Sequence, residues 1–205
     1  CVGITAKTGS QITSGIQASG IVKRLSDIPV VWGGIHPTLL PEQTVSHPLV
    51  DVVVLREGDW TLLELVRVFR SGGSLDGVEG IWHKANGKPV ATSPRPFCNL
   101  DDLPHLPYEI VEPDSGFVAH AEKGFDVDME TSRGCPMRCA FCYNHEFNLS
   151  RWRALSPERT VQRIDHAIRN LPTGSLHFVD DNFFIDLYRA REILRGVKSF
   201  DIPWE

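Results

Sequence analysis

The sequence lacks the features of a membrane-spanning, a secreted and a nucleic-acid-binding protein. No hydrophobic run approaches the roughly 18 apolar residues that a membrane-spanning helix requires. No basic segment followed by an apolar segment indicates a signal peptide. Lysine and arginine form no long run, and the net charge of the 205 residues is −5, so a nucleic-acid partner is not favoured. We expect one or two globular domains that contact neither a membrane nor nucleic acid.

Cysteine is scarce and unevenly placed. Of the five cysteines, Cys1 and Cys98 stand apart, whereas Cys135, Cys139 and Cys142 lie within eight residues. An odd number with one tight cluster does not suit a disulfide framework. The pattern favours metal binding in a reducing, cytoplasmic compartment.

Both ends of the sequence look like parts of strands. The first residues, 1–5, include no Met and have the character of a buried strand, and residues 201–205 have that of a strand that is just beginning. We therefore expect the sequence to be an internal part of a longer protein.

Short β-branched runs alternate with amphipathic segments in the first half of the chain. The predicted strands are 2–5, 29–32, 51–55, 78–83 and 89–92, and the predicted helices are 10–25 and 60–69. Asn86-Gly87 predicts a hairpin between the last two strands. The alternation predicts a Rossmann-like domain over residues 1–96, with a parallel sheet that helices cover on both faces. Ligands of such domains lie at the carboxyl ends of the strands.

A proline-rich stretch separates this domain from a second one. Prolines between Pro94 and Pro113 predict an extended linker over residues 97–120. Beyond the linker, the predicted strands are 126–131 and 175–179, and the predicted helices are 157–170, capped by Ser156, and 187–197. These are the first βα units of a partial TIM barrel over residues 121–205, a fold whose catalytic groups lie in the loops after the strands.

The three clustered cysteines have the spacing C-x3-C-x2-C. Three thiolates on one loop can hold three irons of a 4Fe–4S cluster and leave the fourth iron open for a small molecule. On spacing alone, a structural Cys3His zinc site completed by His145 is an alternative. Three cysteines that bind no metal are the other alternative.

The cysteine loop resembles that of the radical S-adenosylmethionine (SAM) superfamily. The match is residue by residue at Cys135, Cys139 and Cys142, which the resemblance implies are the cluster ligands. An aromatic residue, Phe141, precedes the third cysteine. In the family, the residue at this position lies against the adenine of SAM.

A second match follows the predicted strand 175–179. The family places a polar or acidic motif there, which holds the amino group of the methionine part of SAM. Asp180 and Asp181 occupy this position, so one of them is the expected SAM contact. The double-glycine form of the motif is absent, and Asp181 or Asn182 as the cap of the next helix is an alternative.

The first domain resembles that of cobalamin-binding radical SAM enzymes. The resemblance rests on Gly-Gly-x-His-x-Thr within residues 31–38 and on Glu57-Gly58 after the third predicted strand. It implies cobalamin contacts from Thr5, Gly33, Gly34, His36, Thr38, Glu57 and Gly58. Glycine lets a backbone approach a cofactor closely. An ordinary tight turn for the glycines and a surface position for His36 are the alternatives.

The resemblance implies an enzyme in which a reduced 4Fe–4S cluster cleaves SAM to methionine and a 5′-deoxyadenosyl radical, and cobalamin delivers a methyl group. Alternatives are a radical SAM reaction without methylation, such as cyclisation, ring contraction or methylthiolation, and a non-enzymatic Cys3His zinc-binding module. The expected partners are a small-molecule or peptide substrate and an electron donor. The sequence assigns no catalytic residue.

Overall fold

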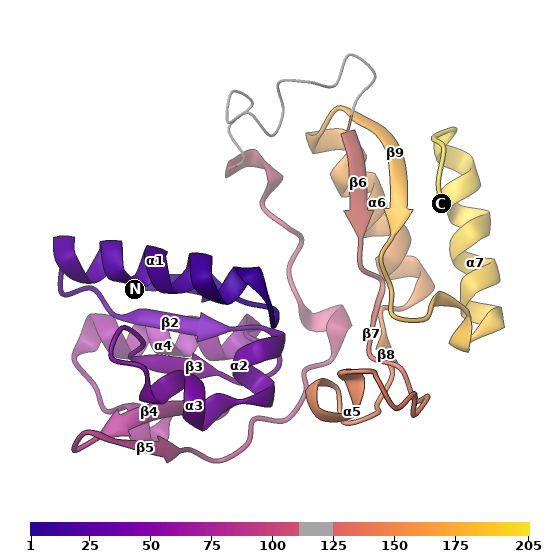
Figure 1. The fold of residues 1–205 in the computed structure, drawn as a ribbon. Helices are drawn as coiled ribbons and strands as arrows, with labels where there is room; N and C mark the ends of the chain where they lie inside the picture. The colour runs from indigo at the N-terminus through magenta and orange to yellow at the C-terminus, as the bar shows by residue number, and fades with distance from the viewer. Residues whose placement is uncertain (111–124) are drawn as a thin grey trace. The chain divides into compact units, whose positions relative to one another are not determined.

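A computed structural model describes residues 1–110 and 125–205, so part of the predicted linker lies outside the described residues (Figure 1). The chain divides into two compact units. The first unit comprises residues 1–97 and 138–149, and the second comprises 98–137 and 150–205. Among the helices that the structure describes, none has the length and apolarity to cross a membrane.

The first unit is built on a mixed sheet with the strand order β1-β2-β3-β4-β5. The parallel strands are β1 (Val2–Thr5), β2 (Val30–Gly33) and β3 (Val52–Val54). The antiparallel pair is β4 (Ile81–Ala85) and β5 (Lys88–Ala91). Asn86 and Gly87 both have positive φ, 51° and 76°, as a two-residue hairpin turn of this kind requires.

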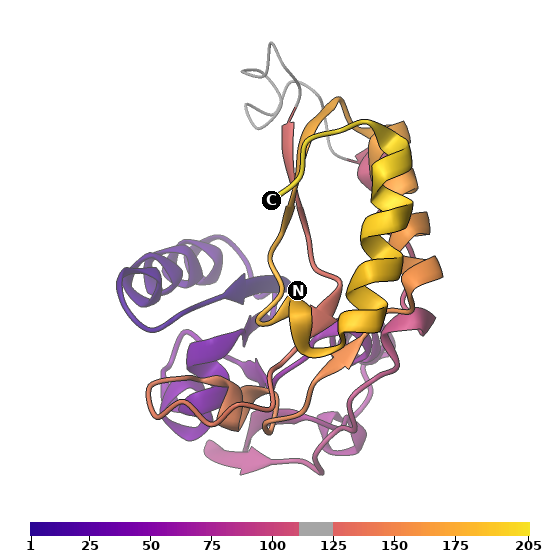
Figure 2. The same cartoon turned by 90° about the vertical axis from the view of Figure 1, so that its right-hand side faces the viewer.

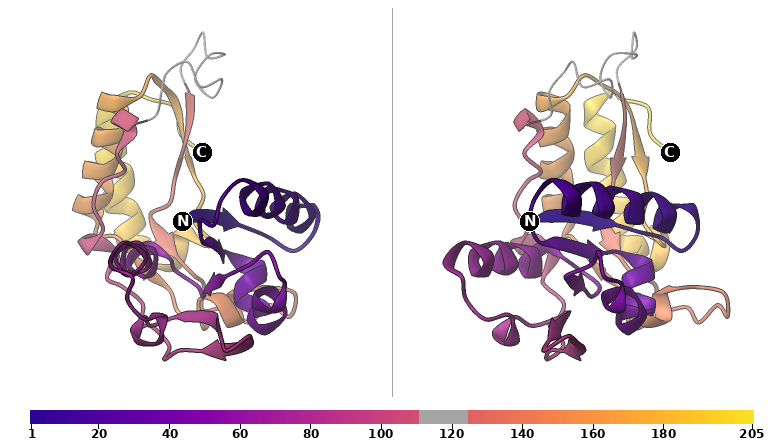
Figure 3. Two further views of the ribbon diagram at one scale, coloured as in Figure 1. Left: turned by 90° about the vertical axis from the view of Figure 1, so that its left-hand side faces the viewer. Right: turned by 60° about the vertical axis from the view of Figure 1, so that its left-hand side comes forward.

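Helices cover both faces of this sheet. The longer ones are α1 (Ser10–Leu25) and α4 (Asp59–Ser71), and the short ones are α2 (Ile35–Leu39), α3 (Pro41–Ser46), α5 (Asn144–Phe147) and the 3-10 turn η1 (Leu75–Gly77). Figure 3 shows α1 and α4 on opposite sides of the sheet. Trp32 is buried beneath α1, where its Nε1 donates a hydrogen bond of 3.0 Å to Ser19 Oγ. Leu65 of α4 is buried against the other face, beside Val31 and Val54.

The second unit is built on the parallel pair β6 (Phe125–Met129) and β9 (Thr173–Phe178), with α6 (Pro157–Asn170) and α7 (Leu187–Val197) packed together on one side of the strands (Figure 2). Its remaining elements are β7 (Ser132–Arg133), β8 (Arg153–Ala154), η2 (Leu100–Asp102), η3 (Tyr108–Ile110), η4 (Phe183–Ile185) and η5 (Lys198–Phe200). Leu176 of β9 also forms a parallel bridge to Trp204, so the strand expected at the end of the chain begins there. Ser156 caps α6, because its side chain accepts a hydrogen bond from Arg159 N.

The described part of the proline-rich segment does not form the extended linker that the sequence predicts. Leu100 and Leu103 are buried in a small core with Leu155. Arginine side chains of α6 donate hydrogen bonds to backbone oxygens of the segment, among them Arg159 Nη2 to Leu103 O at 2.7 Å. Proline content could not show that the segment forms the 3-10 turns η2 and η3, or that two leucines, three residues apart, pack within the second unit.

The same segment places a histidine among cations. His105 Nε2 lies 2.7 Å from Arg159 Nη1, and its ring stacks on that of His166 with centroids 4.7 Å apart. Burial lowers the pKa of His105, and the charges of Arg159, His166 and Arg163 lower it further. Neutral His105 accepts the hydrogen bond from Arg159, so this contact requires the unprotonated imidazole.

Candidate functional site

The carboxyl ends of the parallel strands in the first unit surround a cavity of about 450 Å³. Its walls include residues from the ends of β1 and β2 and from the loop after β3, namely Gly3, Thr5, Gly33, Gly34, Arg56 and Gly58. Ligand sites of open α/β sheets lie at this edge. Four of the seven residues predicted to contact cobalamin therefore line one cavity.

Two of the glycines shape this cavity in different ways. Gly34 has φ +94°, and a Cβ at that position would lie 2.6 Å from Thr5 Oγ1, so no other residue fits there without movement. A Cβ on Gly3 would meet no atom within 4 Å. The missing side chain at Gly3 therefore leaves open space along the wall, as close approach of a ligand to the backbone requires.

The other three residues with a predicted cobalamin contact are not among the lining residues of this cavity. His36 lies in α2 rather than in a loop, is buried, and has its Nδ1 3.2 Å from Thr8 Oγ1. It lines a separate cavity of about 240 Å³. Thr38 Oγ1 accepts a hydrogen bond of 2.8 Å from Arg56 N, which ties α2 to the loop after β3.

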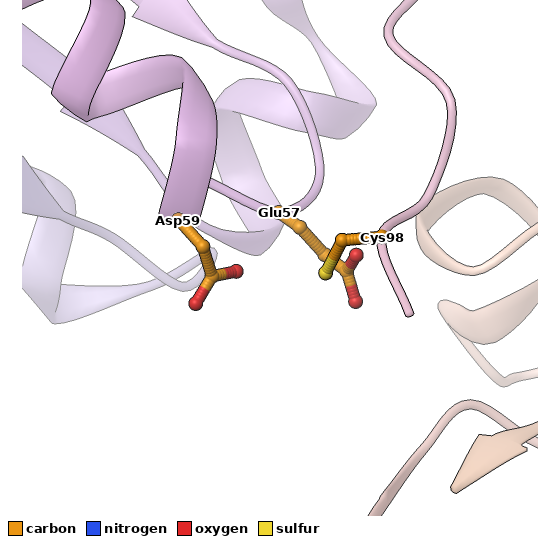
Figure 4. A group of neighbouring side chains, drawn as sticks. All are labelled: Glu57, Asp59 and Cys98. Atoms are coloured by element: carbon orange, nitrogen blue, oxygen red, sulfur yellow. The ribbon is translucent and has the colours of Figure 1, made fainter. Parts of the chain in front are cut away.

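Glu57 follows Arg56 in that loop. Figure 4 shows the Glu57 side chain before α4 and that of Asp59 at the first residue of the helix, and Cys98 of the second unit is also drawn. Asp59 lies in the first helical turn, where a negative charge is favourable next to the unpaired backbone N–H groups.

The cysteine loop begins in the second unit and continues in the first. Cys135 is half-buried, as is Cys142, whereas Cys139 is exposed, and all three are free thiols. Cys142 N donates a hydrogen bond of 2.9 Å to Cys139 O, which forms a turn between the second and third cysteines. Phe141 within this turn is 93% exposed. A large aromatic side chain so exposed offers a flat apolar surface for a ligand ring.

His145, the candidate fourth zinc ligand, already has a hydrogen-bond partner. Its Nε2 lies 2.8 Å from the backbone oxygen of Cys139. A carbonyl oxygen only accepts, so Nε2 carries the proton in this contact, and Nδ1 is the ring nitrogen that keeps a lone pair. The three cysteines supply three thiols on this loop, and three thiolates suit iron of a cluster.

Asp180 does not point away from the protein as a free carboxylate. It accepts hydrogen bonds from Thr131 N at 3.3 Å, from Thr131 Oγ1 at 2.9 Å and from Ser132 Oγ. Asp181, which is exposed, accepts a hydrogen bond of 2.9 Å from Gly134 N. Both carboxylates predicted as SAM contacts thus hold the backbone that leads to Cys135.

Sequence reasoning missed one charged residue of this region. Arg189 of α7 is buried and donates hydrogen bonds of 2.7 Å to Leu155 O and to Thr131 O. Burial lowers the pKa of its guanidinium, and the carboxylate of Asp180 acts against that shift. An arginine within an amphipathic helix gives no sequence signal of burial, because most such residues lie on the solvent face.

A family model of the radical SAM superfamily matches residues 129–202, the segment that contains the cysteine loop and the Asp180 turn. This part of the chain belongs to the radical SAM superfamily. The match confirms the resemblance inferred from the three cysteines.

Relatives extend the similarity over almost the whole chain. An uncharacterised methyltransferase of Pyrococcus horikoshii is 36% identical over 99% of this chain and 44% of its own length. The cytidylyl-2-hydroxyethylphosphonate methyltransferase of Streptomyces wedmorensis is 27% identical over 84% of this chain and 38% of its own length. The chain thus spans less than half the length of these curated relatives.

The fold has a counterpart among solved structures. The radical SAM methyltransferase TsrM from Kitasatospora setae, solved with cobalamin and a 4Fe–4S cluster bound, has a TM-score of 0.74 at 19% identity. The match covers 97% of this chain and 40% of TsrM. The mixed α/β fold with its parallel strands therefore matches the fold of part of TsrM.

Proposed function

We propose that this chain is the cofactor-binding part of a cobalamin-dependent radical SAM methyltransferase. The observation that carries the proposal is the C-x3-C-x2-C loop of three free thiols within the segment that the superfamily model matches. Cys135, Cys139 and Cys142 would hold the cluster, and Phe141 would lie against the adenine of SAM. Bound there, a reduced 4Fe–4S cluster supplies the electron that splits SAM into methionine and a 5′-deoxyadenosyl radical.

The cavity in the first unit supports the cobalamin half of the proposal. Its volume of about 450 Å³ lies within the range of small-molecule sites, so it can take a part of the cofactor such as the nucleotide. Gly3, Gly33, Gly34 and Gly58 contribute no side chain to its walls, so a cofactor can approach the backbone closely. Thr5 contributes a hydroxyl group and Arg56 a positive charge, and these can bind the phosphate and ribose of the cobalamin nucleotide.

The two curated relatives are named as methyltransferases, and this is the support for methyl transfer over another radical reaction. The chain's own residues would bind and orient the cofactors. The substrate, which we expect to be a small molecule or a peptide, and the electron donor are the remaining partners of the proposal.

Anaerobic reconstitution tests the cluster. Wild-type chain should take up about four iron and four sulfide ions, and Cys139→Ser should lose them. Cys1→Ser is the matched control, because Cys1 is an exposed free thiol outside the loop, and this variant should keep the full iron content. His145→Ala should also keep it. Uptake of one zinc ion without iron, lost in His145→Ala, would contradict the proposal and favour the zinc-binding module.

Two further measurements test cobalamin and methyl transfer. The chain should retain a corrin absorbance band after gel filtration with hydroxocobalamin, and absence of the band would remove cobalamin from the proposal. In the complete natural protein, reduction in the presence of SAM labelled at its methyl group should yield 5′-deoxyadenosine and a labelled product. Formation of 5′-deoxyadenosine with an unlabelled product would favour the reaction without methylation.

A further inference from the structure

The backbone that enters the cysteine loop is largely buried. Thr131 and Ser132 have relative exposures of 0% and 1%, and Gly134, the residue before Cys135, is buried with φ +83°. β7 pairs Ser132 with Ala154 of β8. A short ladder of two residues gives little stability by itself, so the direction of this segment depends on its other contacts.

Asp180 supplies the main contacts. Its Oδ1 accepts from the hydroxyl groups of Thr131 and Ser132, and its Oδ2 accepts from the Thr131 amide. Both oxygens of the carboxylate are therefore in use. Hydrogen bonds to an ionised acceptor are about twice as strong as neutral ones, so these contacts dominate the local energetics.

Two further groups fix the same segment from other directions. Arg189 Nη2 donates to Thr131 O at 2.7 Å, and Leu155 N donates to the same oxygen at 2.9 Å. Every polar atom of Thr131 is thereby held. Asp181 Oδ2 holds the Gly134 amide at 2.9 Å, so the segment is fixed again immediately before Cys135.

Asp180 also balances the buried charge of Arg189. Arg189 is 5% exposed, and Asp180 is the carboxylate that acts most strongly against the effect of its burial on the pKa of the guanidinium. The two charged groups bind different groups of Thr131. The Asp180 carboxylate accepts from the Thr131 amide and hydroxyl, and the Arg189 guanidinium donates to the Thr131 carbonyl oxygen. This arrangement sets the orientation of the segment as well as its position.

We propose that Asp180 is a positioning residue that orients the Cys135 end of the cluster loop, and that it is not the ligand of the SAM amino group. A carboxylate offers about four lone-pair sites, and donors of the protein already occupy three of those of Asp180, at both of its oxygens. The inference rests on the proposed cluster function of the loop. It differs from the SAM-contact expectation in one measurable respect, because an anchor acts on the loop whether or not SAM is bound.

The test compares Asp180→Asn with Asp165→Asn. The control removes the same charge at a surface ion pair with Arg169 on α6, far from the loop in sequence. Two readouts are taken without SAM: hydrogen exchange of the amides in 131–134 of the cluster-free chain, and the electron paramagnetic resonance spectrum of the reduced, reconstituted chain. A third readout is the affinity for SAM.

Asp180→Asn should accelerate exchange in 131–134 by about tenfold or more, since an amide carbonyl replaces an ionised acceptor. The resonance spectrum should change before SAM is added, and the affinity of the variant for SAM should stay within about threefold of the wild-type affinity. Asp165→Asn should alter none of the three. Ser132→Ala, which removes one donor only, should give a smaller change of the same kind and serves if Asp180→Asn does not fold.

The opposite pattern would overturn the inference. Exchange and spectrum that match wild type without SAM, together with lost SAM affinity, would assign Asp180 to SAM. If wild-type chain takes up no cluster, the proposed function fails, and the exchange measurement on cluster-free chain still decides whether Asp180 anchors the segment.

Discussion

Replacement of Gly34 by alanine tests how the cavity of the first unit is built. The new Cβ would lie 2.6 Å from Thr5 Oγ1 and 3.2 Å from both the N and the O of Ala6. The Ala6 backbone cannot yield easily, because its N donates to Gly33 O and its O accepts from His36 N. Gly34 also has φ +94° and ψ −163°, a conformation that is essentially restricted to glycine.

The expected cost of Gly34→Ala has two parts. The backbone conformation costs an alanine about 1–3 kcal/mol, and the steric overlap costs about 1–3 kcal/mol more. The sum, about 2–6 kcal/mol, is a large part of the 5–15 kcal/mol that typically stabilises a domain. Urea unfolding followed by circular dichroism measures it, with the free energy extrapolated linearly to water.

Gly3→Ala is the matched control. The alanine Cβ at Gly3 would have no neighbour within 4 Å, so the free energy of unfolding should stay the same or rise by less than about 1 kcal/mol. Because Gly3 lines the cavity, the same variant should still weaken cobalamin retention. If Gly34→Ala unfolds at the same urea concentration as Gly3→Ala, the steric argument for the cavity is refuted.

Three other predictions concern contacts within one unit or the other. Ser19→Ala removes the acceptor of buried Trp32 Nε1 and should lower the free energy of unfolding by about 1–3 kcal/mol, whereas Ser19→Thr should restore part of it. Gly196→Ala would place a Cβ in steric overlap with Val161 Cγ2, so thermal unfolding should show a loss of about 1–3 kcal/mol that Val161→Ala relieves in the double variant. The pKa of His105 lies below its ordinary value of 6.5, so the unfolded chain binds its proton first, and stability should be complete above pH 6.5 and fall as the pH drops below it. In His105→Gln this part of the pH dependence should disappear, and an unchanged acid profile would contradict the assignment.

Much of the fold follows from local sequence patterns. The bounds predicted for α1, 10–25, and α7, 187–197, agree with the structure, because their apolar residues recur at helical spacing. The hairpin at Asn86-Gly87 was predictable for the same local reason, since both residues tolerate positive φ. α2 and α3 were not expected. Pro37 and Pro41 each lie in the first turn of a helix, where no amide donor is needed.

Some features of the candidate site depend on local sequence, and others depend on tertiary contacts. The cysteine spacing is local, so the sequence identified all three thiols. The partners of Asp180 are tertiary, since Thr131 and Ser132 lie 49 and 48 residues away in the chain. An acidic residue after a strand gives the same sequence pattern whether its side chain binds a cofactor or a backbone amide. Only the hydrogen-bond donors that surround it distinguish the two roles.

Both units place their candidate sites just beyond the carboxyl ends of parallel strands, and the physical reason is shared. β1, β2 and β3 end at Thr5, Gly33 and Val54, and the residues at and after these ends form the cavity. β6 and β9 end at Met129 and Phe178. Asp180, just after β9, accepts a hydrogen bond from Thr131, just after β6. Neighbouring parallel strands end side by side, so loops distant in sequence meet there. The residues of each candidate site are therefore carried by loops that neighbouring strand ends bring together.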